Sequence, residues 1–297
     1  MVCYSPLTAY RGSSGTVTFK RQSALDPSRP MKLPCGQCVG CRLEKSRQWA
    51  VRCIHEAKQW ENNCFLTLTY NDQHLPEDRS LHPEHMTNFW KRLRKKHGSG
   101  IRYFYCGEYG DRSGRPHYHA IVFNMVFSDQ KLWRMSRDNP VYRSDTLEKL
   151  WPYGFSSIGS VTMQSAAYVA RYIMKKRTGD GAEDYYDYVD TDGVIHRRLP
   201  EFVRMSRRPG IGQGWIEKYQ SDVYPHDFVV VEGSKFRPPR YYDEQLTEEE
   251  LARLKKKRIE NAEKHAENNT PERRRVRERL HIMRANRLIW PEGKDEL

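Results

Sequence analysis

Two histidines separated by one residue, His117 and His119, stand in a segment that reads as a β-strand, Pro116–Phe123. Side chains at positions i and i+2 of a strand point to the same face, so the two imidazoles lie side by side, as metal ligands would. The preceding segment, 101–108, also reads as a strand, and a loop containing Gly, Asp and Ser joins the two. If these strands pair as a hairpin, Glu108 adds a carboxylate next to His117. Taken alone, a His-x-His pair is more often two partly buried histidines on a sheet.

A second reactive group is the pair Tyr168 and Tyr172, which stand four residues apart in a segment with helical periodicity. At 100° per residue, a helix places both phenols on one face, close to Arg171 and Lys175. A phenol ordinarily has a pKa of about 10, so a tyrosine nucleophile needs a metal ion or a cation such as Lys175 near its oxygen. Tyrosines at this spacing also occur as ordinary helix-surface packing, but this helix has a separate apolar face. That apolar face consists of Ala166, Val169, Ala170, Ile173 and Met174.

Three cysteines, Cys35, Cys38 and Cys41, follow the spacing Cys-x₂-Cys-x₂-Cys. A closed tetrahedral zinc site needs a fourth ligand, and Cys3 is the preferred candidate. An iron–sulfur cluster is the alternative, because such clusters use the same run of cysteines. The total of seven cysteines is odd, which favours metal ligands or free thiols over a disulfide framework. The remaining cysteines, Cys53, Cys64 and Cys106, stand in apolar or strand contexts and are expected to be inert.

The elements that must position these residues follow from the periodicity of the sequence. A helix over about 42–60 precedes the order strand, helix, strand, strand, helix, strand, helix. This order predicts an α+β fold in which an antiparallel sheet is flanked by helices. The expected elements span 65–70, 83–96, 101–108, 116–123, 145–151, 155–161 and the tyrosine helix, which Gly179 should close. The predicted regions are a cysteine-cluster region and helix over 1–62, a core over 63–180, a Tyr/Pro/Gly-rich extension packed on it over 181–246, and a basic helical tail over 247–297.

The chain is strongly basic, with 51 Lys and Arg against 38 Asp and Glu and a net charge of +13. A polyanionic partner suits this charge, and the 12% aromatic residues offer stacking surfaces for unpaired bases. Much of the excess falls in residues 251–290, which we expect to add phosphate contacts. The first residues lack the apolar run of a secretory signal, and no segment is long and apolar enough to span a membrane. We therefore expect a cytoplasmic protein without membrane association.

The combination of these motifs resembles a known family. The strand, the His-hydrophobe-His strand and the tyrosine helix, in this order, look like the HUH endonuclease superfamily, and the two tyrosines are similar to its two-tyrosine branch. Further motifs extend the resemblance to the replication initiators of gokushovirus-type microviruses, over most of the chain to about residue 243. These motifs are Pro34-Cys-Gly-Gln-Cys-Val-Gly-Cys41, Arg115-Pro-His-Tyr-His119, Arg208-Pro-Gly-Ile-Gly212 and Pro238-Pro-Arg-Tyr-Tyr242.

The resemblance implies a ferredoxin-like nickase fold and rolling-circle replication of single-stranded DNA in the cytoplasm of a bacterial host. One tyrosine would become 5′-phosphotyrosyl at a phage origin, and a host polymerase would extend the freed 3′-OH. The sequence has no phosphate-binding loop of the Gly-x₄-Gly-Lys-Ser/Thr type, so a separate host helicase is expected. The implied site consists of Glu108, His117 and His119 for Mg²⁺ or Mn²⁺, Tyr168, Tyr172 and Lys175 for catalysis, and Arg115, Arg171 and Lys176 for DNA contacts.

Two other classes of protein share part of this pattern. Two histidines and a carboxylate also form the facial triad of non-heme iron oxygenases, but an oxygenase would not need the tyrosine helix or the positive charge. A non-catalytic zinc-dependent DNA-binding protein would account for the cysteines, the charge and the aromatic residues. It would leave the histidine pair and the tyrosine pair as coincidences.

Overall fold

The computed structural model describes residues 3–110, 113–136, 139–175, 182–190 and 192–289, with the backbone alone at 172–175, 182–183 and 285–289. The chain divides into two compact units. The larger unit comprises residues 46–246, and the smaller unit combines residues 1–45 with residues 247–297. The helix α1 (Val39–Ala57) belongs to the smaller unit up to Lys45 and to the larger unit from Ser46.

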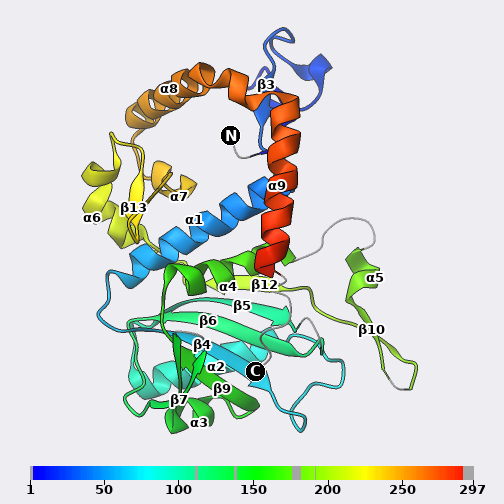
Figure 1. Cartoon of the computed structure of the whole chain (residues 1–297), viewed down its shortest axis with the longest axis vertical. Coiled ribbons are helices and arrows are strands. Elements are labelled where there is room, and N and C mark those ends of the chain that lie inside the picture. The colour runs from blue at the N-terminus through cyan, green and yellow to red at the C-terminus, as the bar shows by residue number, and fades with distance from the viewer. Residues whose placement is uncertain (1–2, 111–112, 137–138, 176–181, 191, 290–297) are drawn as a thin grey trace. The chain divides into compact units, whose positions relative to one another are not determined.

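A seven-stranded antiparallel sheet forms the centre of the larger unit, with the strand order β12-β5-β6-β4-β9-β8-β7 (Figure 1). Its strands are β4 (Asn63–Tyr70), β5 (Arg102–Tyr109), β6 (Pro116–Phe123), β7 (Lys131–Ser136), β8 (Asn139–Arg143), β9 (Gly154–Gly159) and β12 (Phe202–Met205). The helices are α2 (Pro83–His97), α3 (Asp145–Leu150), α4 (Met163–Lys175), α5 (Ala182–Tyr186), α6 (Gln213–Val223) and α7 (Arg240–Asp243). Two small hairpins, β10 (Asp187–Val189) with β11 (Ile195–Arg197) and β13 (Val229–Val231) with β14 (Ser234–Phe236), complete this unit. The predicted α+β class with an antiparallel sheet and flanking helices is confirmed.

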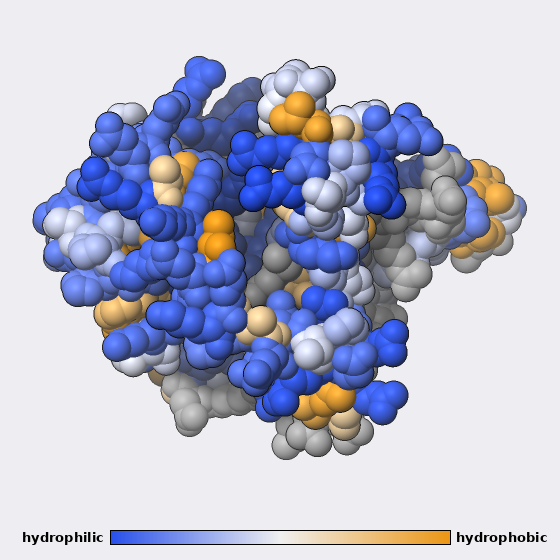
Figure 2. All heavy atoms as spheres, turned by 90° about the horizontal axis from the view of Figure 1, so that it is seen from above, coloured by the Kyte–Doolittle hydropathy of each residue, from blue (hydrophilic) through white to orange (hydrophobic). Residues whose placement is uncertain are grey.

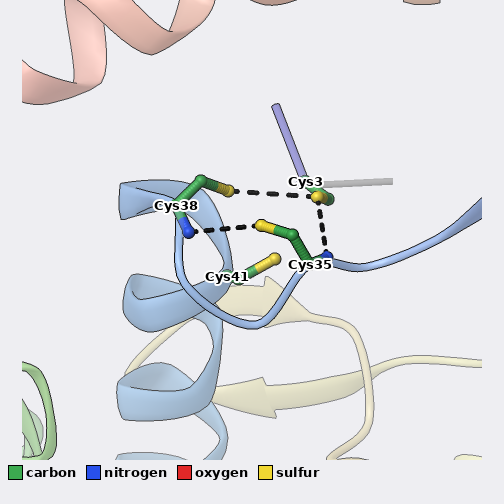
Figure 3. Close-up of side chains that lie close together, drawn as sticks. All are labelled: Cys3, Cys35, Cys38 and Cys41. Atoms are coloured by element: carbon green, nitrogen blue, oxygen red, sulfur yellow. Dashed lines mark hydrogen bonds between the residues drawn. The ribbon is translucent and has the colours of Figure 1, made fainter. Parts of the chain in front are cut away.

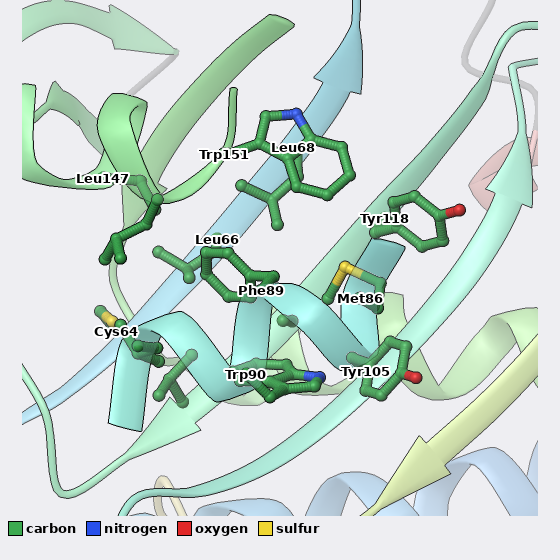
Figure 4. Packing of buried hydrophobic residues seen from close by; sticks show 14 of the residues in the cluster. Cys64, Leu66, Leu68, Met86, Phe89, Trp90, Tyr105, Tyr118, Leu147 and Trp151 are labelled. Carbon is green, nitrogen blue, oxygen red and sulfur yellow. The ribbon is translucent and has the colours of Figure 1, made fainter. Parts of the chain in front are cut away.

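Alternation along the strands gives the sheet two apolar faces. The even-numbered residues of β4 and β6 join Phe89 of α2 and Trp151 in one core, which Figure 4 shows from close by. The odd-numbered residues of β6, including Ile121 and Phe123, belong to a second core on the opposite face. Since each fully buried aliphatic or aromatic side chain contributes about 1.5–3 kcal/mol, the two cores together hold the sheet rigid.

The second core is built from α1 and α4. Residues Ala166, Val169 and Ala170 of α4 are fully buried there, which confirms the part of the predicted apolar face whose side chains are described. Helix α4 contacts β5, β6 and β12, and leaves the outer strands to other neighbours. The helix thereby turns its opposite face, with Tyr168, away from the core.

Residues beyond α4 complete the sheet and the second core. Strand β12 pairs with β5 and becomes one edge of the sheet. The buried Glu56 accepts a hydrogen bond from Nε of Arg102 at 2.6 Å and one from the backbone N–H of Gly212 at 2.7 Å, so α1, β5 and the 209–212 loop meet at one ion pair. Other residues of this segment in the core are Ile211, Ile216, Val223, Val229, Val231 and Tyr242.

The predicted order of elements was incomplete. The hairpin β7–β8 lies between β6 and α3, and the sequence pattern gave no sign of it because β7 is an edge strand with an irregular register, so its residues do not alternate. The helix expected over 42–60 spans Val39–Ala57, and the strand expected over 155–161 spans Gly154–Gly159. The closing role expected of Gly179 falls outside the described residues.

The smaller unit contains more structure than the loose Gly/Ser stretch that the sequence suggested at its start. Strands β1 (Leu7–Arg11), β2 (Val17–Thr18) and β3 (Met31–Leu33) form a three-stranded sheet, with the short helix η1 (Arg21–Ser23) between β2 and β3. The basic tail is helical as predicted, in α8 (Glu248–Lys264), η2 (Ala266–Asn269) and α9 (Pro271–Ile289). Helix α8 opens on a capping box between Thr247 and Glu250.

The hydroxyl of Tyr4 lies 2.6 Å from Nδ1 of His281, which joins the two ends of the chain within this unit. Figure 2 shows one face of the molecule, on which hydrophilic residues predominate and hydrophobic side chains form separate patches. Among the described helices, none has the length and apolar character needed to cross a membrane.

Candidate active site

The structure brings Glu108, His117 and His119 together on one face of the central sheet. Glu108 lies directly opposite His117 in the register of β5 and β6, as the hairpin prediction required. Oε1 of Glu108 is 2.6 Å from Nε2 of His117 and 2.8 Å from Nε2 of His119. The three potential ligand atoms all lie within 4.8 Å of one another. The predicted register is therefore confirmed, and one carboxylate faces two imidazoles.

Protein groups already engage the second nitrogen of each imidazole. Nδ1 of His117 donates to the carbonyl oxygen of Arg115 at 3.0 Å, and Nδ1 of His119 lies 3.1 Å from Oγ1 of Thr67. A His117 that donates at Nδ1 can face an ionised carboxylate through Nε2 only as an imidazolium or with a cation between them. Similar partners on the outer nitrogen orient the histidines of protein metal sites. The donor set and its orientation therefore fit a divalent cation.

Charge at the site favours the same conclusion. Burial alone would raise the pKa of the Glu108 carboxyl, but the adjoining His117 and His119 side chains outweigh burial and lower this pKa to about 2. The carboxylate is only 2% exposed. A buried anion that stays ionised at neutral pH needs a positive partner, which a divalent cation would supply.

Tyr168 stands beside these three residues. Its hydroxyl lies 3.5 Å from Oε1 of Glu108, and its ring meets the ring of His119 edge-on with centroids 5.0 Å apart. The guanidinium carbon of Arg171 lies 5.8 Å from the centre of the Tyr168 ring. Tyr168 is 36% exposed, so a strand of DNA could reach its hydroxyl from solvent. The structure thus brings one predicted nucleophile and one predicted cation to the metal ligands.

The other predicted members of the tyrosine helix are less fully described. The backbone of Tyr172 and Lys175 continues α4 beyond Tyr168. Their side chains, and all of Lys176, lie outside the described residues. Their roles in catalysis and DNA contact stay predictions.

Arg115 has a positioning role in the structure. One of its guanidinium nitrogens donates to the carbonyl oxygen of Tyr70 at 2.9 Å, and another pairs with Asp72. These contacts fix the entry to β6, and the Arg115 carbonyl then orients His117. The predicted contact of Arg115 with DNA stays a prediction.

Two residues near the site were not identified from the sequence. Thr67 lies opposite His119 and Thr69 lies opposite His117 in the register of β4 and β6, so both face the metal ligands. On the next strand, Phe155 lies opposite Thr69 and is 62% exposed. The alternation of Thr with large apolar residues in β4 was a usable signal for Thr67. Phe155 gave none, because an isolated phenylalanine in a strand is ordinarily part of a core.

A second group of potential ligands, also not anticipated, lies at the start of α2 and consists of His82, Glu84 and His85. Nδ1 of His82 is 2.5 Å from Oε1 of Glu84, and Nε2 is 3.2 Å from Oδ1 of Asp78. Burial opposes protonation of His82, but hydrogen bonds to Asp78 and Glu84 prevail and raise its pKa. Ionic hydrogen bonds between a protonated histidine and two carboxylates therefore account for this group without a metal.

The four predicted cysteine ligands also meet in the structure. Cys3, Cys35, Cys38 and Cys41 converge around one point (Figure 3), with their sulfur atoms all within 4.8 Å of one another. The sulfur atoms of Cys3 and Cys38 are 3.9 Å apart. Zinc–sulfur bonds of about 2.3 Å at tetrahedral angles require sulfur–sulfur distances of about 3.8 Å. The arrangement therefore fits a closed zinc site in the smaller unit.

Backbone N–H groups support thiolate character in this cluster. Burial would raise the pKa of Cys38, but hydrogen bonds from the backbone of Tyr4 and Cys41 help to lower it to about 7. The backbone N–H of Cys35 points in the same way at the sulfur of Cys3, at 3.2 Å. By contrast Cys53, Cys64 and Cys106 are free and buried, as predicted for inert thiols.

Replacing Cys38 with serine is expected to abolish tight zinc binding and to unfold the smaller unit at lower temperature. Structural zinc binds small domains with about 10–16 kcal/mol, so its loss removes much of their folding free energy. Elemental analysis of the purified chain, with calorimetry, measures both effects. The substitution Cys64→Ala, which also removes a thiol, should leave about one zinc per chain. Wild-type protein without zinc or iron would contradict the assignment.

Comparisons with known proteins place the chain among phage proteins. The family model of replication-associated protein ORF2 matches residues 63–177, the segment that carries the histidines and tyrosines. The chain is 35% identical over 254 residues to replication-associated protein VP4 of Bdellovibrio phage phiMH2K, an alignment covering 82% of this chain and 76% of that protein. It is 35% identical over 273 residues to replication-associated protein ORF2 of Spiroplasma virus 4, covering 84% and 81%.

The chain is also 31% identical over 223 residues to replication-associated protein ORF4 of Chlamydia phage 1, covering 72% of this chain and 53% of that protein. No solved structure matches the chain.

Proposed function

The chain belongs to the family of phage replication-associated proteins, and from this premise we propose that it initiates rolling-circle replication by nicking single-stranded DNA. In this proposal the chain cuts and rejoins one strand at a phage origin through a 5′-phosphotyrosyl bond, with a divalent metal ion as cofactor. The observation that carries the proposal is the position of the Tyr168 hydroxyl, 3.5 Å from a carboxylate that two imidazoles flank. A non-catalytic DNA-binding protein has no use for this arrangement.

The proposed reaction is an exchange of phosphodiesters. The Tyr168 oxygen attacks phosphorus, its bond to phosphorus forms as the bond to the 3′ oxygen breaks, and the 3′ oxygen leaves as a hydroxyl. A Mg²⁺ or Mn²⁺ ion held by Glu108, His117 and His119 would draw negative charge from the phosphate oxygens. Arg171, beside the Tyr168 ring, favours the ionised form of the phenol.

Tyr172 gives the proposed reaction a second nucleophile. One helical turn separates it from Tyr168, about 6 Å along the axis of α4. While one tyrosine holds the 5′ end of the displaced strand, the other can attack the regenerated origin and release a closed circle. Because the phosphotyrosyl bond retains the energy of the cleaved phosphodiester, the joining step needs no ATP. A host polymerase would extend the free 3′-OH, and a host helicase would unwind the duplex.

The test is incubation of the full chain with end-labelled single-stranded origin DNA of its phage and Mn²⁺. The expected result is one cleaved fragment with a free 3′-OH and a protein–DNA adduct that survives boiling in detergent. A chelator should suppress both products, since the metal ligands would otherwise leave the phosphate charge unbalanced. Nicking that is insensitive to chelator, or cleavage without an adduct, would contradict the proposal.

A further inference from the structure

The half of the sheet formed by β9, β8 and β7 is uncovered on the face that carries His117 and His119. The core on that face contains described residues of β5, β6, α1 and α4, and among the described residues none from β7, β8 or β9. Phe155 of β9, on this face, is 62% exposed. The metal ligands therefore lie at the border between a covered half-sheet and an open one.

A continuous row of side chains leads from the metal ligands onto the open half. Glu108, His117, Thr69 and Phe155 lie directly opposite one another on the neighbouring strands β5, β6, β4 and β9. Directly opposed residues share a face, and strands lie about 4.8 Å apart. Phe155 is thus two strands from His117, about 10 Å across the sheet. Gly154 allows the close approach of β9, because a Cβ at this position would lie 2.5 Å from the Thr69 carbonyl oxygen.

The same open face continues onto β8 and β7. Tyr142 pairs with the buried Ile158, so its neighbour Arg143 points to the opposite face, the one that carries Phe155. The register of β7 shifts between Leu132 and Arg134, which leaves Trp133 as an extra residue. This irregularity puts the Trp133 ring beside both guanidinium groups, with its centre 4.7 Å from Arg134 and 5.7 Å from Arg143.

This surface combines exposed rings with cations that have spare donors. Trp133 is 48% exposed. Nε of Arg134 is buried and has no hydrogen-bond partner among the described residues, so this guanidinium retains unused donor capacity. Arg143 also pairs with Glu148 at 2.7 Å. By sequence, residues 131–143 contain four Lys or Arg and one Asp.

An exposed aromatic residue on an edge strand is normally a liability, because it invites aggregation. Here the charge on the same strand repels copies of the chain and attracts a polyanion. Rings flanked by guanidinium groups form the surface on which unpaired bases stack, and in duplex DNA the faces of the bases are already occupied. The chemistry therefore selects a single strand of DNA.

We propose that the open half-sheet binds the unpaired DNA that flanks the scissile phosphate. Phe155 stacks on a base next to the cut, Trp133 stacks on a base farther along, and Arg134 and Arg143 contact the intervening phosphates. The proposal rests on the proposed function in one respect, that the substrate is single-stranded DNA. It adds the path of the strand away from the metal ligands.

The test measures binding of the full chain, in the Tyr168→Phe/Tyr172→Phe background that cannot cut, to labelled oligothymidylates of about 6 to 20 nucleotides. In this background, Phe155→Ala and Trp133→Ala are expected to weaken binding of the long oligonucleotide about tenfold each, or about 1.4 kcal/mol. The shortest oligonucleotide should lose affinity only with Phe155→Ala. Duplex DNA should bind all variants equally.

Two substitutions serve as matched controls. Leu132→Ala removes a side chain that is 60% exposed from the opposite face of the same strand, and Phe19→Ala removes a phenylalanine that is 61% exposed in the other unit. Both should bind DNA like the background protein. Unchanged affinity for long oligonucleotides in both test variants, or an equal loss for duplex DNA, would overturn the platform. Since binding is measured without cleavage, this result is separate from the adduct test of the proposed function.

Discussion

The double substitution Tyr168→Phe/Tyr172→Phe is expected to abolish the protein–DNA adduct, with nicking reduced by at least about a thousandfold. Phenylalanine removes only the hydroxyl, so the ring of residue 168 keeps its edge contact with His119 and α4 keeps its packing. Affinity for single-stranded DNA should be nearly unchanged. Adduct formation is measured on denaturing gels with end-labelled DNA. The exposed Tyr185 outside the site offers a matched control, since Tyr185→Phe should cut like wild type.

The single substitutions separate one-tyrosine from two-tyrosine mechanisms. Either Tyr168→Phe or Tyr172→Phe alone should retain some nicking of an oligonucleotide, because one hydroxyl remains on the same helical face. Both should fail to release closed circles over repeated rounds, since the second transfer then has no acceptor. Wild-type behaviour of Tyr168→Phe through repeated rounds would leave Tyr172 as the only nucleophile.

Loss of a metal ligand is expected to have an effect of similar size. His117→Ala and His119→Ala should lower nicking by about a thousandfold, because the phosphate charge is then stabilised by fewer partners. Glu108→Gln preserves the shape of the carboxylate and removes its charge, so it should weaken Mn²⁺ binding and recover partial activity at high Mn²⁺. Isothermal titration with Mn²⁺ and nicking rates at several Mn²⁺ concentrations measure both effects.

The control for these substitutions is another histidine–carboxylate pair in the larger unit. Nε2 of His196 lies 2.6 Å from Oδ2 of Asp190, on the β10–β11 hairpin. His196→Ala should leave both nicking and Mn²⁺ binding intact. Nicking that survives all three ligand substitutions would show that the cluster of Glu108, His117 and His119 has a structural role only.

Much of the site was predictable because it depends on local periodicity. The period of two in β6 puts His117 and His119 on one face, and a short hairpin loop is enough to bring Glu108 opposite His117. The apolar stripe of α4 likewise determines that Tyr168 faces away from the core. These relations require only neighbouring segments, so one sequence contains the information.

Features that depend on distant segments were not predictable. Strand β12 pairs with β5 across about a hundred residues, and nothing in the sequence of Phe202–Met205 specifies that partner. The union of residues 1–45 with the tail depends on contacts such as that between Tyr4 and His281, which are far apart in the chain. The exposure of Phe155 and Trp133 follows from where α4 stops covering the sheet, which is a property of packing and has no local pattern.

The most direct test of the account is identification of the residue that becomes joined to DNA. The adduct formed by the wild-type chain with single-stranded origin DNA and Mn²⁺ is digested with trypsin and nuclease and sequenced by mass spectrometry. The account predicts a 5′-nucleotide on the hydroxyl oxygen of Tyr168 or Tyr172, within α4. A nucleotide on any other residue, or an origin cut without a covalent bond to the protein, would contradict it.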